Sequence, residues 1–236
     1  QKIKLHGRYG KMEMKKLNTQ SKCRSCKADL KVTFADLGMS PISNAFLTSE
    51  QLHTMEPFYP LKAFVCESCY LVQLEEFETR ENIFNSNYAY FSSYSDMWLK
   101  HAKEYSVKMI DKLKLSSSSL VVEVASNDGY LLQYFKESGV PVLGVEPSGN
   151  VAAAAVKKGI PTLVEFMGQP LGEKLAAEGK KADLIAGNNV VAHVPDINDF
   201  VKGLMLTLKD SGVITLEFPH LEKQIQFNQF DTIYHE

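Results

Sequence analysis

The chain has 236 residues and a mass of 26.5 kDa, so we expect one main domain with an appendage rather than a mini-protein or two full enzymatic domains. Hydrophobic residues make up 44% of the chain and charged residues 23%, which allows a packed core and excludes overall disorder. The formal net charge is −2, but residues 1–31 carry ten Lys or Arg against two acidic residues, a local +8 that leaves −10 for the remainder.

Residues 1–20 form a basic lead-in. This start is polar and lacks the apolar centre of a signal peptide. No apolar run in the chain approaches the ~20 residues that span a bilayer. We therefore expect a cytoplasmic protein with no membrane partner.

The cysteines form two Cys-x-x-Cys pairs, Cys23 with Cys26 and Cys66 with Cys69, separated by 39 residues. Two such turns can place four sulfurs at ~2.3 Å from one ion in the tetrahedron that zinc accepts. Disulfides fit a reducing cytosol poorly, and a redox motif needs only one pair, although both stay open as alternatives. We predict a structural zinc site in a domain over residues 21–80. Loops and short strands between the pairs would contain too few core residues to fold without the metal.

Residues 81–115 are expected to form a lid and a connecting helix, which Ser95 or Asp96 caps and in which apolar residues recur every three or four positions up to Leu113. From residue 116 to 236 the chain alternates strand and helix patterns. We expect strands over 120–124, 142–146, 160–164, 182–187 and 212–218, and helices over 130–138, 150–158, 171–178 and 196–208. This order predicts a Rossmann-like α/β fold with a parallel sheet of about five strands, whose ligand binds at the carboxyl ends of the strands.

Small and acidic residues follow the first two predicted strands. The turn that begins at Glu123 and ends at Gly129 lacks the three glycines of a dinucleotide-binding motif, which disfavours NAD. Ala125 lets a ligand approach the backbone, Glu123 and Asp128 suit a cationic group, and Glu146 can accept both hydroxyls of a ribose. These features predict S-adenosylmethionine, an adenosine with a charged, phosphate-free tail. The alternative is that both glutamates merely cap strand ends.

Seven segments in order resemble the sugar C-methyltransferases of bacterial deoxysugar biosynthesis, which methylate carbon on nucleotide-linked ketosugars. They are the four-cysteine segment from Cys23, Tyr88-Ala-Tyr-Phe-Ser-Ser-Tyr-Ser95, Ser126-Asn-Asp-Gly-Tyr-Leu-Leu132, Gly144-Val-Glu-Pro-Ser148, Asn188-Asn-Val-Val-Ala-His-Val-Pro-Asp196, Glu217-Phe-Pro-His220 and Asp231-Thr-Ile-Tyr-His-Glu236. The resemblance implies a class I methyltransferase fold behind a zinc-binding domain. It also implies deprotonation next to a ketone, followed by methyl transfer to the enolate.

For the cofactor, the resemblance points to residues at the strand ends. Phe166 would stack on adenine, unless it packs in the core, and Asn188 would meet the amino-acid part. The cofactor-binding residues expected are Glu123, Ala125, Asn127, Asp128, Gly129, Glu146, Pro147, Phe166 and Asn188.

For the nucleotide-sugar substrate, the resemblance implies that Tyr88, His193, Tyr234 and Glu236 face the sugar. Either Tyr234 or His193 would serve as hydrogen-bond donor or base, with Glu236 orienting a partner. For His193 the alternative is a histidine satisfied by loop backbone.

In the resembled family the Tyr-His-Glu run continues into another His, which can be the true base, and then into a further α/β domain. This chain stops at Glu236, so we expect a C-terminally truncated form of uncertain activity. The last strand would then expose an edge at which copies of the chain can associate.

Two other functions remain as alternatives. Basic residues around the first cysteine pair, including Lys22, Arg24, Lys27 and Lys31, are compatible with an RNA or other nucleic-acid methyltransferase. We do not expect a nucleic-acid partner, because the remainder of the chain is acidic. The second alternative is a non-catalytic S-adenosylmethionine-binding fragment.

Overall fold

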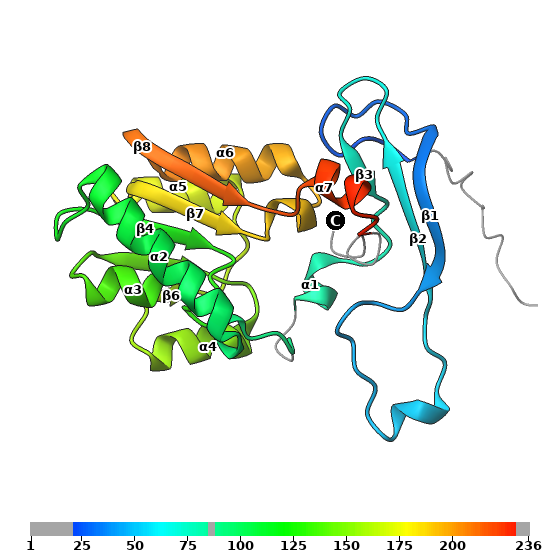
Figure 1. Ribbon diagram of the computed structural model, residues 1–236, viewed down its shortest axis with the longest axis horizontal. Coiled ribbons are helices and arrows are strands. Elements are labelled where there is room, and N and C mark those ends of the chain that lie inside the picture. Colours follow the sequence, from blue (N-terminus) through cyan, green and yellow to red (C-terminus); the bar gives the residue numbers. More distant parts are fainter. Residues whose placement is uncertain (1–20, 85–87, 230–236) are drawn as a thin grey trace, which may run out of the picture.

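The computed structural model describes residues 21–84 and 88–229, which form a small β module and a larger α/β domain (Figure 1). The β module is an antiparallel sheet of three strands in the order β1-β2-β3. Its elements are β1 (Val32–Ser40), a short 3-10 turn η1 (Gln51–His53), β2 (Tyr59–Val65) and β3 (Val72–Leu74). The first two strands form a longer hairpin than the loops and short strands that we expected.

The β module has a small hydrophobic core. Its core cluster contains only Cys23, Leu30 and Cys66 as buried members, with Ala28, Phe64 and Leu71 packed around them. A core of this size stabilises a fold weakly, so the cysteine cluster must supply much of the stability.

The connecting segment contains α1 (Arg80–Ile83), a 3-10 turn η2 (Ser92–Tyr94) and α2 (Asp96–Leu113). The Ser95 hydroxyl accepts a hydrogen bond from the Trp98 amide at 3.2 Å and so caps α2, one of the two caps predicted. Two polar contacts hold α2 to the last strand of the α/β domain, because His101 pairs with Glu217 and Tyr105 bonds to Thr215.

The α/β domain contains one parallel sheet in the order β6-β5-β4-β7-β8, which confirms the predicted fold class. The order reverses beside β4, and such a reversal creates a crevice at the carboxyl ends of the strands. The strands are β4 (Val121–Val124), β5 (Val142–Val145), β6 (Thr162–Leu163), β7 (Ala182–Asn188) and β8 (Leu208–Glu217). The helices are α3 (Leu132–Glu137), α4 (Gly149–Lys157), α5 (Gln169–Ala177), α6 (Ile197–Thr207) and α7 (Leu221–Gln226), with a 3-10 turn η3 (Val191–His193).

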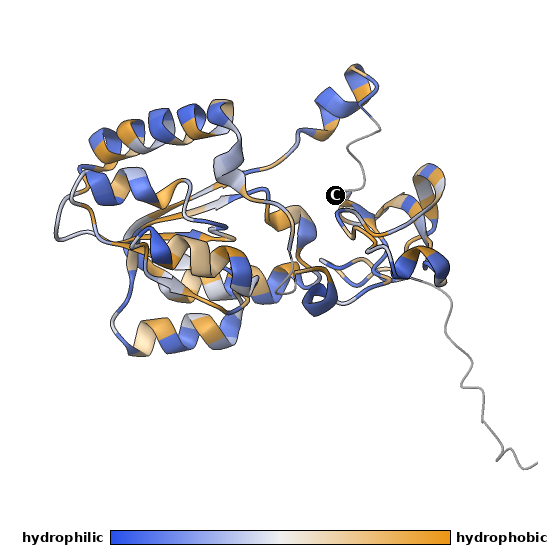
Figure 2. Cartoon of the chain, turned by 90° about the horizontal axis from the view of Figure 1, so that it is seen from below, coloured by the Kyte–Doolittle hydropathy of each residue, from blue (hydrophilic) through white to orange (hydrophobic). Residues whose placement is uncertain are grey.

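Helices cover both faces of this sheet, as a parallel sheet requires. Successive β4 side chains alternate between two clusters: Val121 packs with residues of α2, α3 and α4, whereas Val122 and Val124 pack with residues of α5 and α6. In Figure 2 the central strands are mostly white to orange, and the helices around them alternate orange and blue. The helices α2 to α6 therefore present an apolar side to the sheet.

Two strands of this sheet differ in length from the predicted ranges. The last strand begins at Leu208 instead of residue 212, because the chain pairs with β7 at Ala182 before an irregularity in the register. The third strand pairs with β5 over only two residues. No helix in the described ranges is both long and apolar enough to cross a membrane.

Candidate cofactor and metal sites

The four cysteines of the two Cys-x-x-Cys pairs come together at one end of the β module. The Cys23 and Cys69 sulfurs lie 3.6 Å apart, those of Cys26 and Cys66 lie 3.5 Å apart, and all four lie within 4.8 Å of one another. A regular tetrahedron with metal–sulfur bonds of ~2.3 Å has sulfurs about 3.8 Å apart. All four thiols are free of disulfides, so the cluster fits a structural zinc ion with a closed shell.

Gln73, on β3, is hydrogen-bonded to this cluster. Its side-chain amide donates a hydrogen bond to the Cys23 sulfur at 3.3 Å. Burial raises the pKa of the Cys23 thiol, but hydrogen bonds from Gln73 and from the backbone of Cys26 and Ser25 outweigh it and lower that pKa to about 6. Cys23 is therefore suited to bind metal as a thiolate.

The turn after β4 has an unusual backbone. Ala125, Asn127 and Gly129 all adopt left-handed conformations, with φ of 57°, 48° and 78°. This tight turn brings the Asn127 amide to 2.9 Å from the Glu146 carboxylate on the neighbouring strand end. The ends of β4 and β5 are therefore joined by a hydrogen bond at the crevice.

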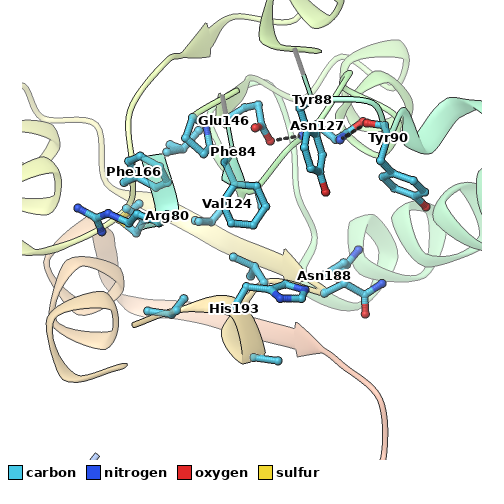
Figure 3. Close-up of a pocket in the computed structure, with 18 of the residues that line it drawn as sticks. Arg80, Phe84, Tyr88, Tyr90, Val124, Asn127, Glu146, Phe166, Asn188 and His193 are labelled. Atoms are coloured by element: carbon cyan, nitrogen blue, oxygen red, sulfur yellow. Dashed lines mark hydrogen bonds between the residues drawn. The ribbon is translucent and has the colours of Figure 1, made fainter. Parts of the chain in front are cut away.

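A cavity of about 530 Å³ opens at this crevice (Figure 3). Its size is typical of a small-molecule site. Eight of the predicted site residues line it: Tyr88, Ala125, Asn127, Glu146, Pro147, Phe166, Asn188 and His193. The fold thus brings six of the nine predicted cofactor residues and two of the predicted catalytic residues to one cavity.

Glu146 is held in place by backbone amides. One carboxylate oxygen accepts from Asn127 at 2.9 Å, and the other accepts from Ser148 at 2.8 Å. Each oxygen keeps a further lone pair, which can accept a ribose hydroxyl. Burial raises the pKa of Glu146, and the two backbone hydrogen bonds offset this shift only in part.

Three predicted cofactor residues do not line the cavity. Glu123 shares its face of β4 with Val121, so it points into the core beneath α2 and α3 and is fully buried. Asp128 is also buried and is neutralised by Lys158 at 3.0 Å. Gly129 packs against Ile160, where an added Cβ would lie 3.0 Å from the isoleucine side chain. The prediction that the Glu123 and Asp128 carboxylates lie beside the ligand is therefore corrected: both are buried away from the cavity lining.

The predicted adenine platform, Phe166, lies at the cavity wall, where the Arg80 guanidinium lies over its ring at 4.4 Å. Sequence reasoning missed Arg80, because a single arginine at the start of the short helix α1 gives no periodic or spacing signal. It also missed Tyr130 as a lining residue, although Tyr130 directly follows the predicted turn. Its hydroxyl accepts a hydrogen bond from the Asn188 amide at 3.1 Å.

The segment that carries Tyr88 is fastened to the strand ends. Asn127 accepts from the Ser92 amide at 2.9 Å and donates to the Tyr90 carbonyl at 3.1 Å, while Asn150 donates to the Tyr88 carbonyl at 2.7 Å. Figure 3 shows the Tyr88 ring pointing into the cavity from this segment. The predicted lid is thus held over the crevice.

A second cavity, of about 480 Å³, lies between the β module and the α/β domain. It is lined by residues of both parts, among them Arg24, Tyr59 and Glu76 from the β module. The residues that line both cavities are Asn44, Arg80, Phe84, Tyr88, Ala192, His193 and Pro195. The two cavities therefore adjoin.

Tyr88 and His193 lie where the cavities meet, on either side of Phe84. The Phe84 ring centroid is 5.5 Å from that of Tyr88 and 6.2 Å from that of His193. Burial, with the nearby Glu146 charge, raises the pKa of Tyr88 to about 12, so its phenol stays protonated at neutral pH. The other two predicted catalytic residues, Tyr234 and Glu236, lie outside the described residues.

The sheet order, the crevice beside β4 and the Glu146 carboxylate at its rim define a class I methyltransferase fold with an S-adenosylmethionine site. Residues 97–236 match a family model described as "Methyltransferase domain", and residues 23–84 match one described as "Putative zinc binding domain". The chain therefore belongs to the methyltransferase domain family, with S-adenosylmethionine as its cofactor. A zinc-binding segment precedes the methyltransferase domain.

The chain is similar to two curated relatives and to one solved structure. C-methyltransferase NovU of Streptomyces niveus is 31% identical over 91% of this chain and 51% of its own length. An uncharacterised methyltransferase of Mycobacterium leprae is 25% identical over 56% of the chain and 51% of its own length. The PH0226 protein of Pyrococcus horikoshii is 17% identical, with a TM-score of 0.48 over 67% of this chain and 69% of its own. The chain spans about half the length of the curated relatives it matches.

Proposed function

We propose that this chain is the cofactor-binding part of an S-adenosylmethionine-dependent C-methyltransferase that acts on a nucleotide-linked deoxy-ketosugar. The observation that carries the proposal is the pair of adjoining cavities, which share Tyr88 and His193. One cavity is lined by six of the residues predicted to bind the cofactor, and the adjoining cavity leaves room for an acceptor. The Streptomyces relative NovU is named a C-methyltransferase, which supports transfer to carbon.

The reaction requires three tasks. A base removes the proton on the carbon next to the ketone, a donor stabilises the enolate oxygen, and the carbon then forms a bond to the methyl group as the methyl–sulfur bond breaks. The sulfur keeps the electron pair of that bond, so the products are the methylated sugar, S-adenosylhomocysteine and a proton on the base.

Tyr88 suits the donor role and not that of the base. A phenol with a pKa of about 12 keeps its proton at neutral pH and can donate to an enolate oxygen. His193 is the imidazole at the same junction, and a ring nitrogen of a neutral imidazole can accept a proton. We therefore assign His193 as the base within the described residues, while Tyr234 and Glu236 keep their predicted roles as a proposal.

The nucleic-acid alternative has weaker support. Of the basic residues around the first cysteine pair, Lys22 is paired with Asp29, and Arg24 donates to backbone carbonyls inside the molecule. The Arg24 guanidinium is therefore used inside the molecule, and Asp29 offsets the charge of the exposed Lys22. A sugar acceptor thus accounts for more of the structure than an RNA acceptor.

The test is a mass-shift assay with S-adenosylmethionine and a panel of nucleotide-linked ketosugars, run with the full-length protein. A gain of one methyl group on a ketosugar, with a paired loss from the cofactor, is expected. Exchange of the acidic sugar proton in deuterated water, with S-adenosylhomocysteine in place of the methyl donor, should accompany it. Methylation of RNA, or binding of the cofactor without transfer to any ketosugar, would contradict the proposal.

A further inference from the structure

Arg24 lies between the zinc ligands Cys23 and Cys26, yet its side chain reaches to the α/β domain. Its Nη1 donates to the Val194 carbonyl at 3.3 Å and to the Ala192 carbonyl at 3.4 Å. Those two carbonyls stand on either side of His193. The arginine thus contacts the backbone immediately before and after the proposed base.

The turn from Cys23 to Lys27, which we call the first zinc knuckle, is also hydrogen-bonded to β3 and linked to a metal ligand. The Arg24 Nη2 donates to the Leu74 carbonyl at 2.8 Å, and the Arg24 amide donates to the Gln73 side chain at 2.8 Å. Gln73 in turn donates to the Cys23 sulfur at 3.3 Å. A continuous set of hydrogen bonds therefore joins a zinc ligand to the turn that carries His193.

A second tether runs in parallel. The Asn198 side chain, in the first turn of α6, donates to the Ser25 carbonyl at 2.8 Å. The residues between His193 and Asn198 connect η3 to α6, so the knuckle contacts both ends of this short connection. Lys27, the next basic residue of the knuckle, is exposed and bonds only to the Arg24 carbonyl among the contacts of the described chain.

The partners of Arg24 indicate positioning rather than charge pairing. Burial lowers the pKa of its guanidinium, and the charge of Glu76 offsets this shift only in part. Within the described ranges, Arg24 makes no ion pair with a carboxylate within 4.0 Å, and Nη1 and Nη2 of its guanidinium donate to backbone carbonyl oxygens. The planar fork of arginine can hold several carbonyls in one arrangement, which a lysine cannot.

We propose that Arg24 is a positioning residue that fixes η3, and so makes the orientation of His193 depend on the folded zinc knuckle. The proposal rests on the proposed function for the role of His193 and adds a task for the zinc module. The module sets the geometry of the base at the junction of the cavities, in addition to stabilising its own fold.

The test compares Arg24→Gln with Lys27→Gln, which removes the same charge from the same knuckle without touching η3. Zinc content and affinity for S-adenosylmethionine should stay unchanged in both. The ring ¹⁵N signals of His193, assigned by their loss in His193→Gln, should move in Arg24→Gln and stay in place in Lys27→Gln. Turnover of the acceptor should fall about 10- to 100-fold in Arg24→Gln through kcat, because a misplaced catalytic group costs rate. Arg24→Lys should restore only part of it.

Unchanged His193 signals in a zinc-loaded Arg24→Gln would overturn the proposal. If Arg24→Gln loses its zinc, the test uses Asn198→Ala, which lies outside the knuckle. A smaller movement of the His193 signals in Asn198→Ala supports the proposal, whereas unchanged signals contradict it. The signals are read without turnover, so an inactive wild-type protein would reject the proposed function and leave this inference to be decided by the spectra.

Discussion

Glu146 and Glu123 are carboxylates on neighbouring strands with opposite surroundings. Glu146 accepts two backbone amides at the rim of the cavity, whereas both oxygens of Glu123 lack a hydrogen-bond partner among the described residues. Sequence position predicted both as ligand-facing. Only Glu146 follows the last residue of its strand, whereas Glu123 lies within β4, where the alternation of side chains sends it into the core.

Replacing Glu146 with Ala should weaken S-adenosylmethionine binding by about 1–3 kcal/mol, the cost of leaving ribose hydroxyls without an acceptor. Binding should also weaken in acid. Because burial raises the pKa of Glu146, this loss should begin at a higher pH than for an exposed glutamate. Isothermal calorimetry measures both effects, with the exposed Glu137→Ala as the control. Equal affinity in Glu146→Ala would remove Glu146 from the site.

Glu123→Gln should make the stability of the domain less dependent on pH. Burial raises the pKa of Glu123 well above 4.5, and the nearby charges of Glu146 and Asp128 raise it further. A raised folded-state pKa favours the protonated protein, so this contribution is complete below the unfolded pKa and is lost as pH rises through the folded value. As pH increases, the melting temperature of Glu123→Gln should therefore rise relative to that of the wild type. If the melting temperature of the variant instead falls further below that of the wild type as pH increases, the Glu123 carboxylate is charged and paired.

Tyr88→Phe should lower kcat for ketosugar methylation by roughly 100-fold, as expected when one donor to a developing oxyanion is removed. Affinity for S-adenosylmethionine should change little. Because the pKa of Tyr88 is about 12, the wild-type pH–rate profile should show no loss of this donor below about pH 10. Steady-state kinetics with the full-length protein measure this, and Tyr94→Phe, at an exposed tyrosine of the same segment, is the control.

The zinc knuckles are the elements whose pairing follows most directly from sequence, because two Cys-x-x-Cys turns leave few other arrangements. The hairpin between them was harder to predict. Residues 32–40 lack a strict alternation of apolar and polar side chains, and β1 pairs with β2 through register irregularities, so its strand length depends on pairing that no local pattern encodes. By contrast, β4 and β7 are mostly apolar apart from Glu123, Asp183 and Asn188, so a local pattern indicates them as strands.

Cys66→Ser should lower bound zinc from about one ion per chain to near zero and unfold the β module while the parallel sheet stays folded. The reason is that the module buries few residues besides its cysteines. Metal analysis and amide exchange, measured on the same samples, test this. Ser68→Ala, in the same knuckle, should keep its zinc. Full zinc retention in Cys66→Ser would contradict a four-thiolate site.

For the whole molecule, the sheet leaves β8 at one edge, paired only with β7 among the described strands. Association of copies through this edge remains a proposal. Sedimentation at increasing protein concentration would test it, with Ile214→Pro on β8 expected to reduce any dimer, because proline removes a backbone donor. A dimer that is unaffected by this change would place the contact elsewhere.

We expect S-adenosylmethionine to lie at the ends of β4 and β5 with its sulfur toward the second cavity. A crystal structure with S-adenosylhomocysteine tests it most directly. We predict ribose hydroxyls within about 2.6–3.2 Å of the Glu146 carboxylate, and a sulfur atom that faces the junction between Tyr88 and His193. A nucleoside bound away from Glu146, or a sulfur turned from that junction, would contradict the account.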